Sequence, residues 1–179
     1  KGIIKLLRRM QVGETVRDLG LEGQVQKQGT PTMGGLMIIA GIIIPTVLFA
    51  LFNVYIVLML VATVWLGTIG FIDDYRKLVL KDSRGLPARW KYLLQSIFGA
   101  LAAVLLYVSA DTPAATALYL PFFKTVAIPL GIAFIVIAYF WIVGFSNAVN
   151  LTDGLDGLAI MPTVLVSCAL GVFAYASGN

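Results

Sequence analysis

The chain consists of long apolar stretches separated by short segments that hold almost all of its charges. No residue from Met33 to Ile72 is charged. A single helix over that run, rising about 1.5 Å per residue, would be roughly 60 Å long, against a hydrocarbon core of about 30 Å. The run therefore predicts two membrane spans, approximately residues 36–52 and 55–72, with a turn at Phe52–Val54.

Three further apolar stretches predict spans at approximately residues 92–110, 128–145 and 158–177. The expected fold is an all-α integral membrane protein with five transmembrane helices, forming a single and partial transmembrane domain over residues 1–179. Segment 111–127 is expected on the periplasmic side, partly as a short hairpin. Because 59% of the residues are hydrophobic and only 12% are charged, the alternative of an ordinary soluble domain is disfavoured.

The basic residues orient this topology. All of them except Lys124 precede the first span or lie between the second and third spans. The positive-inside rule places those segments in the cytoplasm, together with segment 146–157. The net charge of +4 then reflects membrane topology and requires no nucleic-acid partner.

The ends and the residue types that are absent also bear on function. The amphipathic, basic start "KGIIKLLRRMQ" and the end just after a span suggest an internal fragment of a longer protein. There is no histidine, and the single cysteine, Cys168, is expected to be a packing residue within a span. Acid–base or metal chemistry must then rest on carboxylates, lysine, asparagine and threonine.

Adjacent carboxylates end the second span, in "GFIDDYRK" (residues 70–77). Asp73 and Asp74 repel each other, and the C-terminal end of a helix disfavours anions. One interpretation is a solvated helix end, in which Asp73 and Lys77 pair at i, i+4 spacing. The other is a divalent cation, for which oxygen ligands at a polar mouth would suit Mg²⁺.

A second polar cluster lies in "SNAVNLTDGLDGLA" (residues 146–159), on the same predicted face of the membrane. Polar residues recur there every three positions, which would not keep them on one face of a regular helix: Asn147, Asn150, Asp153 and Asp156. The glycines among them favour a break or tight turn, with Thr152 or Asp153 as the N-cap of the fifth span. A helix N-terminus offers backbone N–H groups to an anion, whereas the alternative is a capped interhelical loop.

A third segment, "KQGTPTMGG" (residues 27–35), leads into the first span. Thr32 offers a hydroxyl, and the two glycines allow a phosphate or another backbone to approach closely. Lys27 adds a cationic donor for a phosphate oxygen. Such an entry into a helix is common, so this segment alone indicates little.

Together, "GTPTMGG", "GFIDDYRK", "RGLPARWKY" and "NAVNLTDGLDGLA" resemble the bacterial phospho-N-acetylmuramoyl-pentapeptide transferases. These belong to the polyprenyl-phosphate N-acetylhexosamine-1-phosphate transferase superfamily, and the matching text spans nearly the whole chain in the order of the family. The resemblance implies a multi-pass enzyme of the bacterial cytoplasmic membrane that acts on its cytoplasmic side in peptidoglycan synthesis. It would transfer phospho-MurNAc-pentapeptide from its UDP carrier to undecaprenyl phosphate, giving lipid I and UMP, with Mg²⁺ as cofactor; a homodimer is compatible with it.

The resemblance also implies roles for individual residues. Asp73 would be the base toward the lipid phosphate, or alternatively an aspartate would be a covalent nucleophile. Asp74 and Asp153 would complete the catalytic set and hold metal, while the principal Mg²⁺ ligand would be a further aspartate outside these residues. The chain also lacks the His-rich loop of the family. Because the principal metal ligand and the helices that would close the cleft are missing, the 179 residues alone are expected to be inactive. Substrate binding would fall to Lys27, Thr32, Lys77, Asn147, Asn150 and Asp156.

Two other functions remain open. A GlcNAc-1-phosphate transferase that uses the same lipid would share the Asp pair and the Asn/Asp repeat. "GTPTMGG" favours the muramoyl enzyme, because relatives tend to carry a basic residue after the threonine-proline. A transporter is the alternative from another class, but its ion sites would lie near the bilayer midplane, whereas these carboxylates gather at one mouth.

Overall fold

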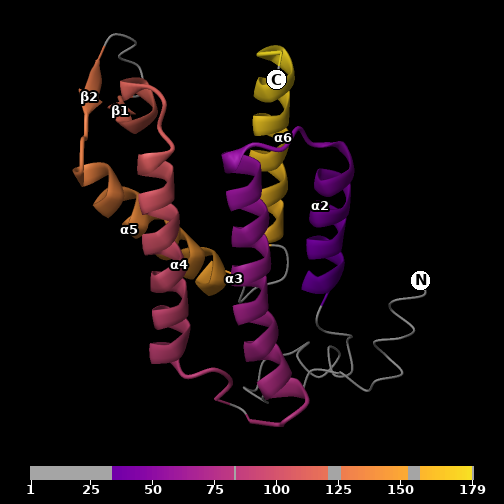
Figure 1. Ribbon diagram of the computed structural model, residues 1–179. Helices are drawn as coiled ribbons and strands as arrows, with labels where there is room; N and C mark the ends of the chain where they lie inside the picture. Colours follow the sequence, from indigo (N-terminus) through magenta and orange to yellow (C-terminus); the bar gives the residue numbers. More distant parts are fainter. Residues whose placement is uncertain (1–33, 83, 121–125, 153–157, 179) are drawn as a thin grey trace. The chain divides into compact units, whose positions relative to one another are not determined.

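The computed structural model of the chain describes residues 34–82, 84–120, 126–152 and 158–178 (Figure 1). These residues form two compact units that divide between Ser109 and Ala110. The described part is mostly helical, which confirms the expected helical character. Three of its helices are long and apolar enough to cross a membrane, over Val54–Lys77, Ala88–Val108 and Ala133–Thr152. The chain therefore has the character of a membrane protein.

The first unit contains α2 (Gly35–Phe49), α3 (Val54–Leu78) and α4 (Ala88–Val108). The break that was expected at Phe52–Val54 corresponds to the connection from α2 to α3, where Asn53 caps α3 by accepting a hydrogen bond from the Ile56 N–H at 2.9 Å. Asparagine is a favoured N-cap because its side chain satisfies an N–H that has no partner within the helix. A polar residue thus separates two apolar helices.

α3 packs against both α2 and α4. Toward α4, the Trp65 indole N–H donates to the Leu94 carbonyl at 3.1 Å, and the Trp65 ring stacks on Phe98 with centroids 6.4 Å apart. Toward α2, a Cβ on Gly67 would lie 2.6 Å from Ile39 Cδ1, so the missing side chain allows the two helices to approach. Small residues commonly serve this purpose where helices pack in a membrane.

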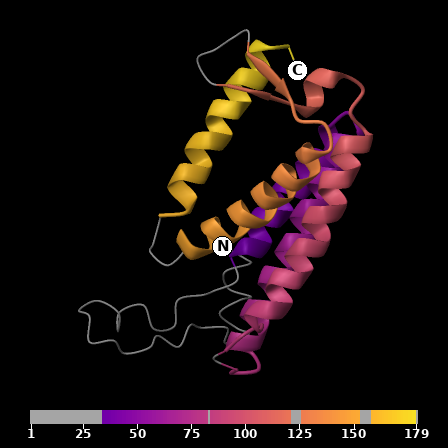
Figure 2. The same ribbon diagram turned by 90° about the vertical axis from the view of Figure 1, so that its left-hand side faces the viewer.

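The second unit contains a 3₁₀ helix, η2 (Pro113–Thr116), two strands and two helices. Strand β1 (Ala117–Tyr119) pairs antiparallel with β2 (Ala127–Pro129), which confirms the hairpin expected in this segment. The helices α5 (Ala133–Thr152) and α6 (Ile160–Ala176) follow, as the turned view also shows (Figure 2).

The expectation that Thr152 caps the last helix is wrong. Thr152 is the final residue of α5, and its hydroxyl donates back to the Val149 carbonyl at 2.8 Å. The N-cap position of α6 is Ala159, which has no capping side chain. The polar repeat of the sequence therefore begins inside α5, and Asp153, the alternative cap, lies outside the described residues.

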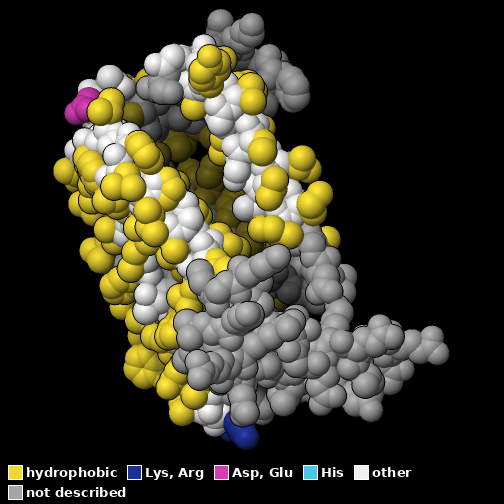
Figure 3. Space-filling view, turned by 90° about the vertical axis from the view of Figure 1, so that its right-hand side faces the viewer, with side chains coloured by type: hydrophobic (Ala, Val, Ile, Leu, Met, Phe, Trp, Pro, Cys, Tyr) yellow, Lys and Arg dark blue, Asp and Glu magenta, His cyan; other side chains and the backbone are white. Residues whose placement is uncertain are grey.

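Large apolar side chains remain exposed along the helices of both units. On the face shown in Figure 3, hydrophobic side chains cover much of the described surface, and Lys or Arg side chains are visible only at one end. Hydroxyl groups within the apolar helices are satisfied locally; for example, Thr63 and Thr68 donate to the carbonyls four residues earlier at 2.8 and 2.7 Å. Both features suit helices surrounded by lipid, where unsatisfied polar groups are costly.

Candidate functional site

Asp73 lies in the last turns of α3 and is buried, with 8% of the residue exposed. Lys77 Nζ donates to its Oδ2 at 2.6 Å, which is the i, i+4 ion pair expected from the sequence. The Leu86 N–H, from the connection to α4, donates to its Oδ1 at 2.7 Å. Both carboxylate oxygens are thus held by a donor, one from the same helix and one from a loop 13 residues further along.

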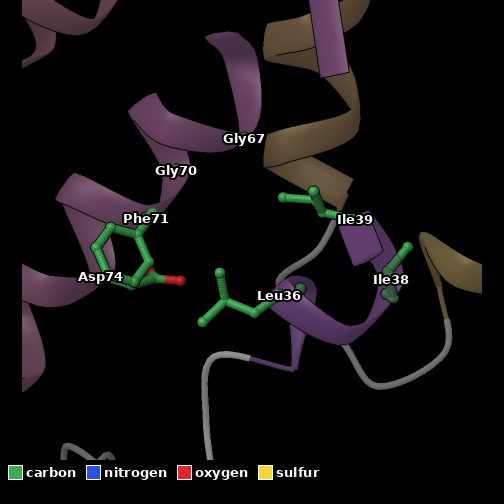
Figure 4. A pocket seen from close by; sticks show the side chains of 8 residues that line it. Leu36, Ile38, Ile39, Gly67, Gly70, Phe71 and Asp74 are labelled. Carbon is green, nitrogen blue, oxygen red and sulfur yellow. The ribbon is translucent and has the colours of Figure 1, made fainter. Parts of the chain in front are cut away.

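Asp74 points elsewhere, because successive residues of an α-helix are about 100° apart around the axis. It is exposed and lines a cavity of about 270 Å³ between α3 and α2. Figure 4 shows its carboxylate directed from α3 toward Leu36 of α2. The remaining walls are apolar or glycine: Gly35, Leu36, Ile38, Ile39, Gly67, Gly70 and Phe71. The two adjacent aspartates therefore lie in two different environments: Asp73 contacts the loop that leads to α4, and Asp74 lines the cavity toward α2.

The connection from α3 to α4 folds back onto the end of α3. Arg76 Nη2 donates to Asp82 Oδ2 at 2.8 Å, and the Asp82 N–H donates to the Arg76 carbonyl at 3.0 Å. The Arg84 N–H also donates to Asp82 Oδ1 at 3.2 Å. The hydrogen bond from Arg76, aided by that from Arg84, lowers the pKa of the partly exposed Asp82 carboxyl. This set of contacts closes the loop on the turn of α3 that carries the aspartates.

The other predicted site residues are divided between the second unit and the part of the chain outside the described residues. Asn147 and Asn150 lie on α5, and Asn147 Nδ2 donates to the Val143 carbonyl at 2.8 Å. The remaining predicted residues lie outside the described part: Lys27, Thr32, Asp153 and Asp156.

The side chains available as metal ligands can be compared with what the expected Mg²⁺ would need. Within residues 34–82, 84–120, 126–152 and 158–178, no three His, Cys, Asp or Glu side chains lie close enough to hold a metal ion. Asp73 is engaged by Lys77 and Leu86, and Asp74 is the only carboxylate among the described residues that line the cavity. Mg²⁺ needs six oxygens in near-octahedral geometry, several of which can be waters. The described residues alone do not form such a site, although Asp74 could contribute one ligand to it.

Gly85 and the Leu86 amide were not predicted as parts of the site. They lie in "RGLPARWKY", which resembles the family segment but contains no obvious catalytic residue. Gly85 has a φ of +62°, in the left-handed region that favours glycine. One sequence signal could have indicated this turn: Gly85 lies two residues before Pro87, in the polar connection that follows the two aspartates.

Comparisons with known families identify the family of the chain. The model of glycosyl transferase family 4 matches residues 56–179, well over half of the chain. The phospho-N-acetylmuramoyl-pentapeptide-transferase signature 1 matches residues 27–39. The family match includes the turn of α3 with Asp73 and Asp74, and the signature extends into the part of α2 that faces Asp74 across the cavity.

Proposed function

Because the chain belongs to glycosyl transferase family 4, we propose that it transfers phospho-MurNAc-pentapeptide from UDP-MurNAc-pentapeptide to undecaprenyl phosphate. The products would be lipid I, for peptidoglycan synthesis, and UMP. One observation carries the proposal. Leu36, Ile38 and Ile39, at the end of the transferase signature, line the same cavity as Asp74, although more than thirty residues separate them from it in sequence.

The reaction joins two anions, so charge and position decide its rate. An oxygen of the lipid phosphate forms a bond to the β-phosphorus of the UDP carrier. The bond from that phosphorus to the bridging oxygen breaks, and UMP leaves with the electron pair. Residues near this centre must therefore attract phosphate, orient it, and accept a proton where the attacking oxygen carries one.

Lys77 and Asp73 are suited to work as a unit in this step. An incoming phosphate would compete with Asp73 for the Lys77 ammonium, since lysine presents several donors on a flexible stem. The phosphate would then lie next to Asp73 Oδ2, which Lys77 Nζ contacts at 2.6 Å. Asp73 would accept the proton, while the Leu86 N–H keeps its other oxygen in place.

The remaining assignments extend the site beyond the described residues. By the family resemblance, Asp74 and Asp153 would complete the catalytic set, Asn150 and Asp153 would line the catalytic cleft, and Asn147 would take part in substrate binding. Lys27, Thr32 and Asp156 would contact the nucleotide–sugar. Mg²⁺, when bound, would neutralise charge on the diphosphate; Asp74 and Asp153 would contribute ligands, and a further aspartate would be the principal one.

Carboxylate substitutions in the full-length protein test this function. We expect Asp73→Asn and Asp74→Asn each to lower the rate of UMP release by about 10²-fold or more, the range of general acid–base groups. Binding of the UDP-sugar should change little, because these groups act chiefly on the transition state. The matched control is Asp111→Asn, an exposed carboxylate of the second unit, which should keep the wild-type rate. Wild-type turnover in either variant would show that the substituted carboxylate takes no part in the reaction.

A GlcNAc-1-phosphate transferase is the second candidate, because the family match covers that chemistry as well. The signature at residues 27–39 favours the muramoyl substrate. Assays with each UDP-sugar and undecaprenyl phosphate separate the two. If product formed with UDP-GlcNAc but not with UDP-MurNAc-pentapeptide, the protein would be a GlcNAc-1-phosphate transferase and the proposed substrate would be wrong.

The site is proposed to face the cytoplasm in a protein with five spans, including the shorter apolar helices α2 and α6. Single cysteines at Thr116 and Ser83 in a Cys168→Ser background test this topology with a membrane-impermeant maleimide. We expect Thr116→Cys to be labelled from the periplasm and Ser83→Cys only after the membrane is opened. Labelling of both positions from one side would contradict the topology.

A further inference from the structure

The Asp73 carboxylate depends on a loop contact that its own helix cannot supply. Lys77 lies one turn further along α3 and reaches Oδ2, whereas Oδ1 is held by the backbone N–H of Leu86. The orientation of the carboxylate is therefore fixed only while the loop stays against α3. The residue that precedes the donating amide, Gly85, decides how close the loop can come.

Gly85 is suited to this position for two separate reasons. Its φ of +62° is one that residues with a Cβ rarely adopt. A Cβ here would also lie 2.5 Å from Asp73 Oδ1 and 2.6 Å from Lys77 Cε, closer than nonbonded atoms approach. Gly131 and Gly178 also have positive φ values, of +51° and +73°, but a Cβ on either would meet nothing within 4 Å. Within the described residues, Gly85 is the only glycine that has a left-handed backbone and no room for a Cβ.

Each way of relieving that crowding would disturb the same pair. If the Lys77 stem moved, Nζ would leave the carboxylate that it contacts at 2.6 Å. If the Asp73 side chain rotated, both of its hydrogen bonds would be lost. If the loop withdrew, the Leu86 N–H would no longer reach Oδ1.

We propose that Gly85 is a positioning residue of the transferase: by lacking a side chain, it lets the Leu86 amide and Lys77 together fix the Asp73 carboxylate for the reaction. The catalytic consequence rests on the proposed function, whereas the contact itself does not. Asp82 ties the loop to α3 separately: its carboxylate accepts from Arg76 Nη2 at 2.8 Å, and its N–H donates to the Arg76 carbonyl at 3.0 Å. The Gly85 N–H, which donates to the Asp82 carbonyl at 2.9 Å, closes the turn within the loop. A Cβ at Gly85 should therefore shift the pair locally and leave the loop attached.

Gly85→Ala in the full-length protein tests the proposal, with Gly131→Ala as the matched control. Both variants place a Cβ on left-handed backbone, but only the first crowds a neighbour. Misplacement of reacting groups by about 1 Å can cost about 10²-fold in rate. We expect Gly85→Ala to lower kcat at least about tenfold relative to Gly131→Ala, with the KM for each substrate changed less than about threefold.

Amide hydrogen exchange at Leu86 provides a readout that does not require turnover. Its protection factor should fall at least about tenfold in Gly85→Ala and stay unchanged in Gly131→Ala, because a broken hydrogen bond leaves the amide open to exchange. If kcat in the two variants agreed within about twofold, or if protection at Leu86 were unchanged, the proposal would be wrong. A wild-type protein without transferase activity would instead refute the proposed function, and the exchange data would then decide the role of Gly85 in holding Asp73.

Discussion

Trp65→Phe should destabilise the first unit by a small and calculable amount. The substitution removes the indole N–H that donates to the Leu94 carbonyl at 3.1 Å and joins α3 to α4. It keeps an aromatic ring in position to stack on Phe98. Because phenylalanine has no N–H, no donor is left unsatisfied. The Leu94 carbonyl lies within α4 and retains the helical hydrogen bond of its own turn.

The expected cost follows from these contacts. Hydrogen bonds between membrane helices contribute about 0.6 kcal/mol on average and about 1.7 kcal/mol at most. The smaller ring adds little to this loss, since lipid chains replace the apolar contacts that it gives up. We therefore expect a loss of about 0.6–1.7 kcal/mol. Trp65→Leu, which also removes the ring stacking, should cost about 0.5–1.5 kcal/mol more.

The measurement is unfolding in mixed detergent and SDS micelles, followed by far-ultraviolet circular dichroism and evaluated by linear extrapolation. The control is Trp141→Phe on α5, where the described residues show an edge contact to Phe145 but no hydrogen bond from the indole. It should unfold like the wild type. If Trp65→Phe also matched the wild type within about 0.3 kcal/mol, the link between α3 and α4 would not stabilise the unit, contrary to this reasoning.

Two further predictions concern α2 and the loop. Gly67→Ala should destabilise the protein by about 1 kcal/mol through overpacking, because its Cβ would lie 2.6 Å from Ile39 Cδ1. Adding Ile39→Val, which removes Cδ1, should restore most of the loss in the same unfolding assay; no restoration would exclude this contact as the cause. Asp82 has a lowered pKa, so its contact with Arg76 should stabilise the fold above about pH 4 and be lost as the pH falls through the folded-state pKa. The stability difference between wild type and Asp82→Asn should therefore shrink on acidification, and a constant difference would contradict the assignment.

Contacts that depend on local sequence could be predicted. Apolar runs indicated the helices, and the asparagine between two of them marked a break that the structure shows as the Asn53 cap. The spacing of Asp73 and Lys77 predicted their ion pair, because residues four apart are neighbours on any helix surface. The hairpin of β1 and β2 forms in the connection between two spans where a short hairpin was expected.

Contacts that depend on the path of a loop could not be predicted. The bond from the Leu86 N–H to Asp73 joins residues 13 positions apart and exists only because the connection folds back at Gly85. The approach of Gly67 to Ile39 depends on how two apolar helices meet, which their nearly uniform hydrophobicity does not specify. Thr152 was assigned to the wrong helix because a threonine near glycines suits a cap, whereas α5 extends to include it.

Because Asp73 and Asp74 have different surroundings, the number of residues in α3 ahead of them decides which way each carboxylate points. One residue inserted into the middle of this helix would rotate everything beyond it by about 100°, so that Asp73 would take the direction that faces the cavity and Asp74 would turn away from it. Four inserted residues would rotate it by about 40° beyond a full turn, and three would fall about 60° short. Among insertions of one to four residues between Trp65 and Gly70, four should therefore be the least harmful, although this insertion also displaces the end of α3 by about 6 Å along its axis.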